Sequence, residues 1–158
     1  MWEDVRKSKG DFGWVVSLLE RGTGMWVTDG LFTKELRDDI SGVGWIFLSF
    51  KTGHKLTGAF HEESVQAGSY RGERLGLLTI HLLLAAITEH FGITIKETTI
   101  CCDNKGGLYA SLKRSPRVKA GAFDDNIDRV ARRISKTIPK GIKYEWVATH
   151  QDGNKSWK

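Results

Sequence analysis

Apolar and polar residues alternate with the period of a β-strand in three segments of the first half of the chain. These segments are residues 25–30, 42–50 and 55–60, and Thr52-Gly53-His54 before the last of them is typical of a hairpin turn. Short strands joined by such turns pair with their neighbours in sequence. The pattern therefore predicts a three-stranded antiparallel meander over residues 25–61.

The hydrophobic period changes to that of a helix after the meander. Residues 69–91 carry two apolar stripes, one made by Leu75, Leu78, Leu82 and Ala86 and the other by Leu77, Ile80, Leu84 and Ile87. Two stripes predict a helix that is buried on most of its sides, with Gly92 as its C-cap. The apolar run at residues 98–103 then predicts a buried parallel strand, followed by a short helix that Asn104 caps.

The last part of the chain predicts one more helix and one more strand. Residues 123–138 have a helical pattern that Pro139 ends, and residues 143–147 form an apolar-polar strand pattern. The predicted order is β-β-β-α-β-α-α-β, an α/β fold with a mixed sheet and helices on its faces. We expect residues 24–158 to form this domain and residues 1–23 to be an N-terminal flank or linker, in which residues 14–19 have the composition of a strand.

Length and charge narrow the classes of protein. A chain of 158 residues fits one domain, and a composition of 40% hydrophobic and 27% charged residues disfavours an intrinsically disordered protein. No uninterrupted apolar run approaches the roughly 20 residues of a membrane span, so we expect no membrane partner. The 24 basic against 19 acidic residues give a net charge of +5 with neutral histidines. This excess favours a polyanionic partner without requiring one.

The cysteines and the start of the chain bear on the cellular compartment. Cys101 and Cys102 are the only cysteines and are adjacent on a predicted strand, where neighbouring side chains point to opposite faces. A disulfide between them is not expected, which fits a reducing compartment. The first nine residues lack the apolar stretch of a signal peptide. We therefore expect an intracellular protein of the cytoplasm or nucleus.

Three carboxylates lie at the ends of elements that this order brings together. Asp29 follows the apolar part of the first strand, Asp103 ends the fourth, and Glu73 lies in the first turn of the long helix. Ligands of such sheets gather at the carboxyl ends of strands. Three acids repel one another unless a divalent cation neutralises them, which favours Mg²⁺ or Mn²⁺. Each acid also has an ordinary interpretation, as a turn residue, a first-turn helix residue or a helix cap.

Five stretches, in their order and spacing, resemble the ribonuclease H family, in particular the domains attached to reverse transcriptases of retroelements. The resemblance runs from about Gly24 to His150. The stretches are Val27-Thr28-Asp29-Gly30, Gly42-Val43-Gly44-Trp45, Gly68-Ser69-Tyr70-Arg71-Gly72-Glu73-Arg74-Leu75-Gly76-Leu77-Leu78, Cys102-Asp103-Asn104 and Trp146-Val147-Ala148-Thr149-His150-Gln151-Asp152. Gly72 and Arg74 depart from the family's alanine and leucine, and the glycine costs about 1 kcal/mol of helix stability.

The resemblance implies hydrolysis of the RNA strand of RNA–DNA hybrids with two Mg²⁺ or Mn²⁺ ions, one activating water and the other stabilising the leaving oxygen. Asp29, Glu73 and Asp103 would hold the ions, and His150 would assist proton transfer or product release. The family's fourth carboxylate lies in a helix beyond the histidine, whereas only 8 residues follow His150 here. Three alternatives stay open: Asp152 replaces it, the final helix is missing, or the chain is a catalytically silent module that binds nucleic acid or braces a polymerase. A transposase or resolvase of this fold ranks last.

The resemblance also implies where the hybrid is bound and which partner accompanies the domain. Backbone groups around Gly30, Ser69 and Asn104 would read the minor groove, where the 2′-hydroxyl distinguishes RNA. Basic residues after the fourth strand would contact phosphates, with a solvated charged face as the alternative; they are Lys105, Lys113, Arg114, Arg117 and Lys119. A reverse transcriptase domain on the same polyprotein is the expected covalent neighbour.

Overall fold

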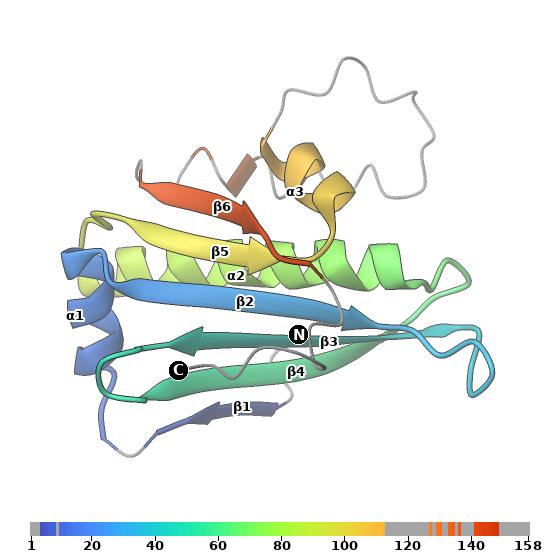
Figure 1. The fold of residues 1–158 in the computed structure, drawn as a ribbon, viewed down its shortest axis with the longest axis horizontal. Helices are drawn as coiled ribbons and strands as arrows, with labels where there is room; N and C mark the ends of the chain where they lie inside the picture. Colours follow the sequence, from blue (N-terminus) through green and yellow to red (C-terminus); the bar gives the residue numbers. More distant parts are fainter. Residues whose placement is uncertain are drawn as a thin grey trace.

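A computed structural model describes residues 4–8, 10–112, 127, 129–130, 133–134, 136 and 141–148. Its strands form one mixed sheet in the order β1-β4-β3-β2-β5-β6 (Figure 1). The strands are β1 Asp4–Lys7, β2 Gly24–Leu31, β3 Ile40–Leu48, β4 Lys55–Glu63, β5 Thr98–Cys102 and β6 Ile142–Trp146. The helices bounded within these residues are α1 Gly13–Arg21, α2 Ser69–Phe91 and α3 Lys105–Leu112.

The predicted meander is confirmed. β2 pairs antiparallel with β3, and β3 pairs antiparallel with β4. Gly53 takes a left-handed φ of +69° in the turn between β3 and β4, a conformation that glycine adopts without steric cost. β5 pairs parallel with β2 and with β6, as its continuous apolar character predicted.

The N-terminal segment differs from the prediction. Residues 14–19 are not a strand but lie within α1, because Val15 and Leu19, four residues apart, fall on one helical face and are both buried. Gly22 ends α1 with a left-handed φ of 72°, and its amide donates to the Leu18 carbonyl. β1 pairs with β4, and the Lys96 amide donates to the Leu19 carbonyl. Residues 4–8 and 10–22 therefore pack against the sheet and its core through β1 and α1.

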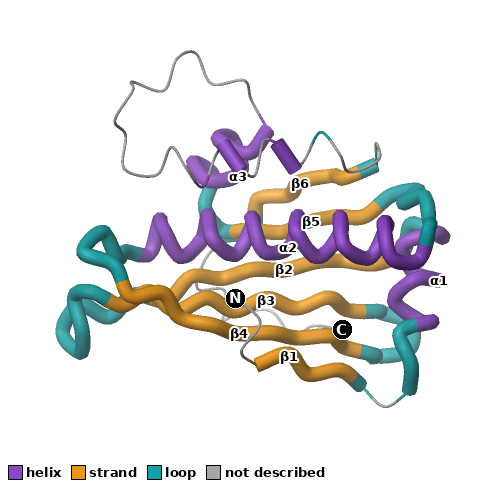
Figure 2. Tube along the Cα trace, turned by 180° about the vertical axis from the view of Figure 1, so that it is seen from behind, coloured by secondary structure: helices purple, strands orange, loops and turns teal. Residues whose placement is uncertain are grey.

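Helix α2 lies over β2 and β3 on one face of the sheet (Figure 2). Gly76 allows the close approach, since a Cβ there would lie 1.9 Å from the Thr28 Oγ1. By length and composition alone α2 is apolar enough to cross a membrane, but 56% of its apolar window is buried inside the domain. Helix α2 is therefore a core helix of the domain. Gly92 caps its C-terminus as predicted, with a φ of 61°.

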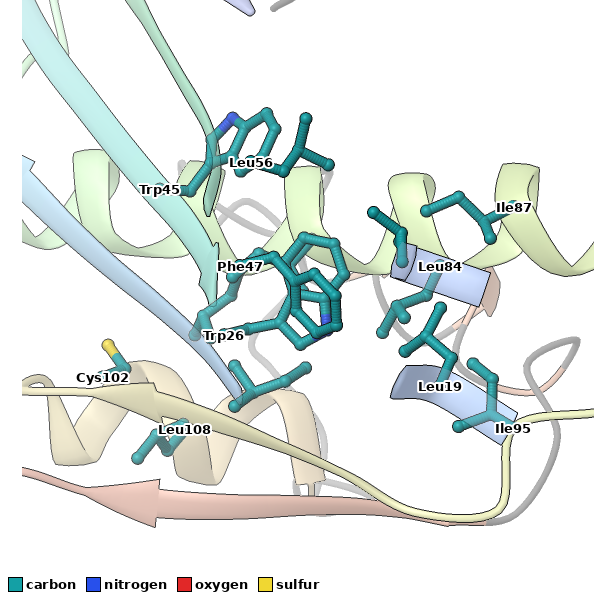
Figure 3. Packing of buried hydrophobic residues seen from close by; sticks show 14 residues of the cluster. Leu19, Trp26, Trp45, Phe47, Leu56, Leu84, Ile87, Ile95, Cys102 and Leu108 are labelled. Atoms are coloured by element: carbon teal, nitrogen blue, oxygen red, sulfur yellow. The ribbon is translucent and has the colours of Figure 1, made fainter. Parts of the chain in front are cut away.

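The core lies between this sheet face, α1 and α2. The Trp26 and Phe47 rings have centroids 4.5 Å apart and pack toward Leu19 and Leu84 (Figure 3). Their interlocking fixes the position of β2 and β3 beneath the helices. A separate buried contact, between the fully buried His81 of α2 and the Tyr144 hydroxyl, ties the edge strand β6 to the same helix.

The second half of the predicted order is confirmed as far as α3 and β6. Asn104 caps α3 as expected, because its Oδ1 accepts a hydrogen bond from the Gly107 amide at 2.8 Å. The helix predicted over residues 123–138 falls largely outside the described residues. Within it, residues 127, 129–130 and 133–134 are helical.

Candidate active site

Two parallel strands and the start of α2 converge where the carboxylates lie. Strands β2 and β5 lie side by side (Figure 1). Thr28 pairs with Cys102 in their parallel ladder, so Asp29 and Asp103 follow at the next register step. Gly30 lets the first turn of α2 lie directly on β2, since a Cβ on Gly30 would be 2.5 Å from the Glu73 amide nitrogen. This contact brings the Glu73 side chain over the strand ends.

Glu73 is held by two donors. The residue is only 4% exposed, and its Oε1 accepts a hydrogen bond from the Gly30 amide at 2.8 Å. The Cys102 thiol donates to Oε2 at 3.3 Å, and the Asn104 amide in turn donates to the Cys102 sulfur at 3.4 Å. Because both oxygens are engaged, the carboxylate has a fixed orientation before any ligand arrives.

Asp103 brings a second carboxylate to the same point. Ligand atoms of Glu73, Cys102 and Asp103 all lie within 4.8 Å of one another. The Asp103 Oδ1 is buried and has no hydrogen-bond partner among the described residues. A buried carboxylate oxygen without a donor is costly unless a cation or water completes it. Two carboxylates with one such oxygen fit the oxygen-rich coordination that Mg²⁺ and Mn²⁺ prefer.

These carboxylates open onto a cleft of about 390 Å³. Its lining combines acidic, basic, polar and aromatic side chains, namely Ser69, Glu73, Asp103, Asn104, Lys105 and Trp146. A cleft with anionic groups inside and a lysine beside them can receive a cation together with a phosphate-bearing ligand.

No family model and no curated protein matches the sequence, whereas solved structures match the fold. Ribonuclease H1 from the halophilic archaeon Halobacterium salinarum NRC-1 matches with a TM-score of 0.55 at 15% identity, over 80% of this chain and 86% of that one. Prototype foamy virus protease–reverse transcriptase matches with a TM-score of 0.63 at 12% identity, over 88% of this chain and 19% of that one. LC11-RNase H1 in complex with an RNA/DNA hybrid matches with a TM-score of 0.51 at 10% identity, over 82% and 88%.

The chain has the ribonuclease H fold. This confirms the fold expected from the sequence, a mixed α/β sheet with a covering helix. At identities of 10–15%, these structural matches establish the fold alone. The chemistry has to be inferred from the residues of the site. The carboxylates of this ribonuclease H fold therefore have to be judged by their own surroundings.

Not every predicted site residue of this ribonuclease H fold joins the cleft. Glu73 and Asp103 come together, and Ser69, Asn104 and Lys105 line the same cleft. Asp29 is exposed and lies outside the group formed by Glu73, Cys102 and Asp103. The remaining predicted residues lie outside the described part of the chain; they are Lys113, Arg114, Arg117, Lys119, His150 and Asp152.

Two other residues at the site were not predicted as site residues from the sequence. Cys102 contacts Glu73, and Trp146 lines the cleft. Strand alternation carries a signal for Cys102, because it shares the core face with Ile100, toward α2. The only indication for Trp146 in the sequence is its place as the first residue of the closing family-like stretch. The Gly30 amide donates to Glu73 and is thus engaged within the protein, while the expected minor-groove contact around Gly30 stays a prediction.

The electrostatics of Glu73 follow from its position. Burial raises the pKa of Glu73 to about 8, the Gly30 hydrogen bond opposes this shift, and the negative charge of Asp103 adds to it. Burial also raises the pKa of the Cys102 thiol, so the sulfur stays protonated and remains a donor. Without a cation, the Glu73–Asp103 pair therefore retains a proton near neutral pH. A divalent cation would favour the fully ionised pair.

Glu73→Gln is expected to remove a pH dependence of folding stability that the protein shows in EDTA. An acid whose pKa is about 8 in the folded protein, against an ordinary value of 4.5, stabilises the fold below pH 4.5, and this contribution is lost as the pH rises toward 8. Melting temperatures in EDTA should fall from pH 5 to pH 8 for the parent and less for the variant. Glu20→Gln, at an exposed position of α1, is the matched control and should follow the parent. Identical pH profiles for Glu73→Gln and the parent would contradict the shifted pKa.

Proposed function

We propose that the chain is a divalent-cation-dependent endonuclease that hydrolyses the RNA strand of RNA–DNA hybrids. The observation that carries the proposal is the Glu73–Asp103 pair at the carboxyl end of β5, with a buried Asp103 oxygen that lacks a partner among the described residues. Within a ribonuclease H fold, this pair lies where ligands of such sheets gather.

Glu73 and Asp103 are the proposed ligands of Mg²⁺ or Mn²⁺. Asp29 lies outside their group but directly follows Thr28, the residue that pairs with Cys102, and it is the proposed third ligand. Asp152, beyond the described residues, is the proposed fourth carboxylate for a second ion. When bound, the two ions activate water and stabilise the leaving oxygen of the phosphodiester. Gly30 and Cys102 hold the Glu73 carboxylate in place, which reduces the reorganisation that binding requires.

The cleft supplies groups suited to the nucleic acid. The Asn104 side-chain oxygen caps α3, and its NH₂ group can still donate hydrogen bonds. Ser69 offers a hydroxyl at the exposed start of α2, in the same cleft. Such groups suit the 2′-hydroxyl of an RNA strand. Lys105, Lys113, Arg114, Arg117 and Lys119 are the proposed phosphate contacts, and His150 the proposed group for proton transfer or product release. The matched LC11-RNase H1 structure contains an RNA/DNA hybrid, which supports this substrate class.

We also propose that the domain works beside a reverse transcriptase on one retroelement polyprotein. The chain spans 19% of the matched foamy virus protease–reverse transcriptase, which supports its being one domain of a longer polyprotein.

We further propose an intracellular, reducing location, which the buried free thiols of Cys101 and Cys102 support.

A substrate panel tests the proposed function. With Mg²⁺ or Mn²⁺, the chain is expected to cut the RNA strand of a hybrid labelled on both strands. The DNA strand, an RNA duplex, a DNA duplex and single strands of the same sequence should stay intact. Binding of the hybrid without any cutting would contradict the enzyme and favour a silent binding module. Cutting of all the nucleic acids alike would contradict the hybrid specificity.

A further inference from the structure

Trp146 and Lys105 form a pair at the cleft that no catalytic step above uses. Trp146 is the last residue of β6 and Lys105 the first of α3, and the Lys105 Nζ lies 3.8 Å from the centroid of the Trp146 ring. Both side chains line the cleft that holds Glu73 and Asp103. Two elements far apart in the sequence thus meet beside the carboxylates.

Trp146 is exposed and yet fixed. The residue is 47% exposed, although tryptophan is highly buried on average. Its Nε1 donates to the Asp103 carbonyl at 2.8 Å, and the following amide, of Val147, donates to the Cys102 carbonyl at 3.1 Å. The indole is therefore tied to the backbone of the residue that bears the site carboxylate, while one part of its ring faces Lys105.

The position of the ammonium has an electrostatic consequence. Lys105 lies two residues after Asp103, so the site carboxylates attract its charge toward the place where a cation would bind. A cation–π contact with an indole competes with that attraction and reduces the freedom of a flexible lysine. The Trp146 ring thereby keeps the Lys105 ammonium next to the site carboxylates and prevents it from pairing directly with them.

We propose that Trp146 positions the Lys105 ammonium to bind a phosphate of the nucleic-acid strand that enters the cleft. The inference rests on the proposed function, because a strand must enter next to Glu73 and Asp103. Lys105 is the phosphate-binding residue, and Trp146 is a positioning residue that acts through it. A lysine contacts phosphate as a point charge, so the contact is independent of base sequence and sensitive to salt.

A double-mutant cycle on hybrid binding tests the pair. The variants are Lys105→Met, Trp146→Leu and the double variant, with anisotropy of a labelled hybrid in EDTA measured from low to high salt. Lys105→Met should weaken binding about 5- to 10-fold at low salt and lower the salt slope by about 1. Trp146→Leu should weaken it about 2- to 5-fold with Lys105 present and have no effect in the Lys105→Met background.

Two further variants keep the test decisive. Lys143→Met removes a lysine of β6 whose ammonium pairs with Glu97, and it should leave hybrid binding unchanged. Trp146→Phe keeps an aromatic ring but loses the indole N–H, and it replaces Trp146→Leu in the cycle if that variant lowers the melting temperature. Equal effects of Lys105→Met and Lys143→Met, or additive effects of Lys105→Met and the Trp146 change, would overturn the inference. A parent chain that neither binds nor cuts the hybrid would instead overturn the proposed function.

Discussion

Asp103→Asn is expected to abolish cleavage of the hybrid while the fold stays intact. The change keeps the size of the side chain but removes one of the two anionic groups that face each other at the cleft. We expect the cleavage rate to fall to roughly one-thousandth of the parent rate or less, a loss of the size that follows removal of one member of a catalytic group. Loss of the Asp103 charge also removes the repulsion that Glu73 meets when it ionises, so the melting temperature in EDTA at or above pH 8 should stay equal or rise.

Asp38→Asn is the matched control for Asp103→Asn. Asp38 lies exposed in the loop between β2 and β3, and its replacement changes the net charge by the same amount. This variant should cut the hybrid at the parent rate. Cleavage by Asp103→Asn at a rate close to that of Asp38→Asn would show that Asp103 is not part of the active site.

Gly30→Ala is expected to damage both stability and activity. A Cβ at this position would lie 2.5 Å from the Glu73 amide nitrogen and 2.8 Å from the Gly72 carbonyl carbon, so the first turn of α2 must move away from β2. Overpacking of this kind costs about 1–3 kcal/mol of folding free energy. Since the shift also displaces Glu73 from its Gly30 donor, we expect cleavage to fall about 100-fold.

Gly44→Ala provides the comparison for Gly30→Ala. Gly44 lies in the neighbouring strand β3, and a Cβ there would meet no heavy atom within 4 Å. Thermal melts and hybrid cleavage rates should therefore match the parent for Gly44→Ala and fall together for Gly30→Ala. A Gly30→Ala chain with parent stability and parent activity would contradict the close contact between α2 and β2.

The sequence predicts the central sheet well because its elements have distinct periods. The antiparallel strands β2 to β4 alternate, β5 is continuously apolar, and α2 carries two apolar stripes. It fails at residues 14–19, where a short apolar run fits a strand as well as a helix and only the core contacts of Val15 and Leu19 decide. The strand β1 has no apolar pattern of its own and exists through pairing with β4.

The sequence predicts the acids Glu73 and Asp103 of the site but not the residues that surround them. The positions of Glu73 and Asp103 follow from the order of elements and from the family resemblance. The contact of Cys102 with Glu73 depends on the exact register of β5 against α2, which no local pattern encodes. The pairing of Lys105 with Trp146 depends on how β6 joins the sheet, 41 positions further along the sequence numbering. Long-range contacts of this kind require the folded structure.

The rate of hybrid cleavage with and without divalent cation tests the central claim most directly. One preparation of the chain is assayed on an RNA–DNA hybrid with labelled RNA, first in Mg²⁺ or Mn²⁺ and then after chelation with EDTA. Our account predicts cutting of the RNA strand that stops on chelation and returns when the cation is restored. Cutting that persists in EDTA, or no cutting with either cation, would contradict the proposal that Glu73 and Asp103 hold a catalytic cation.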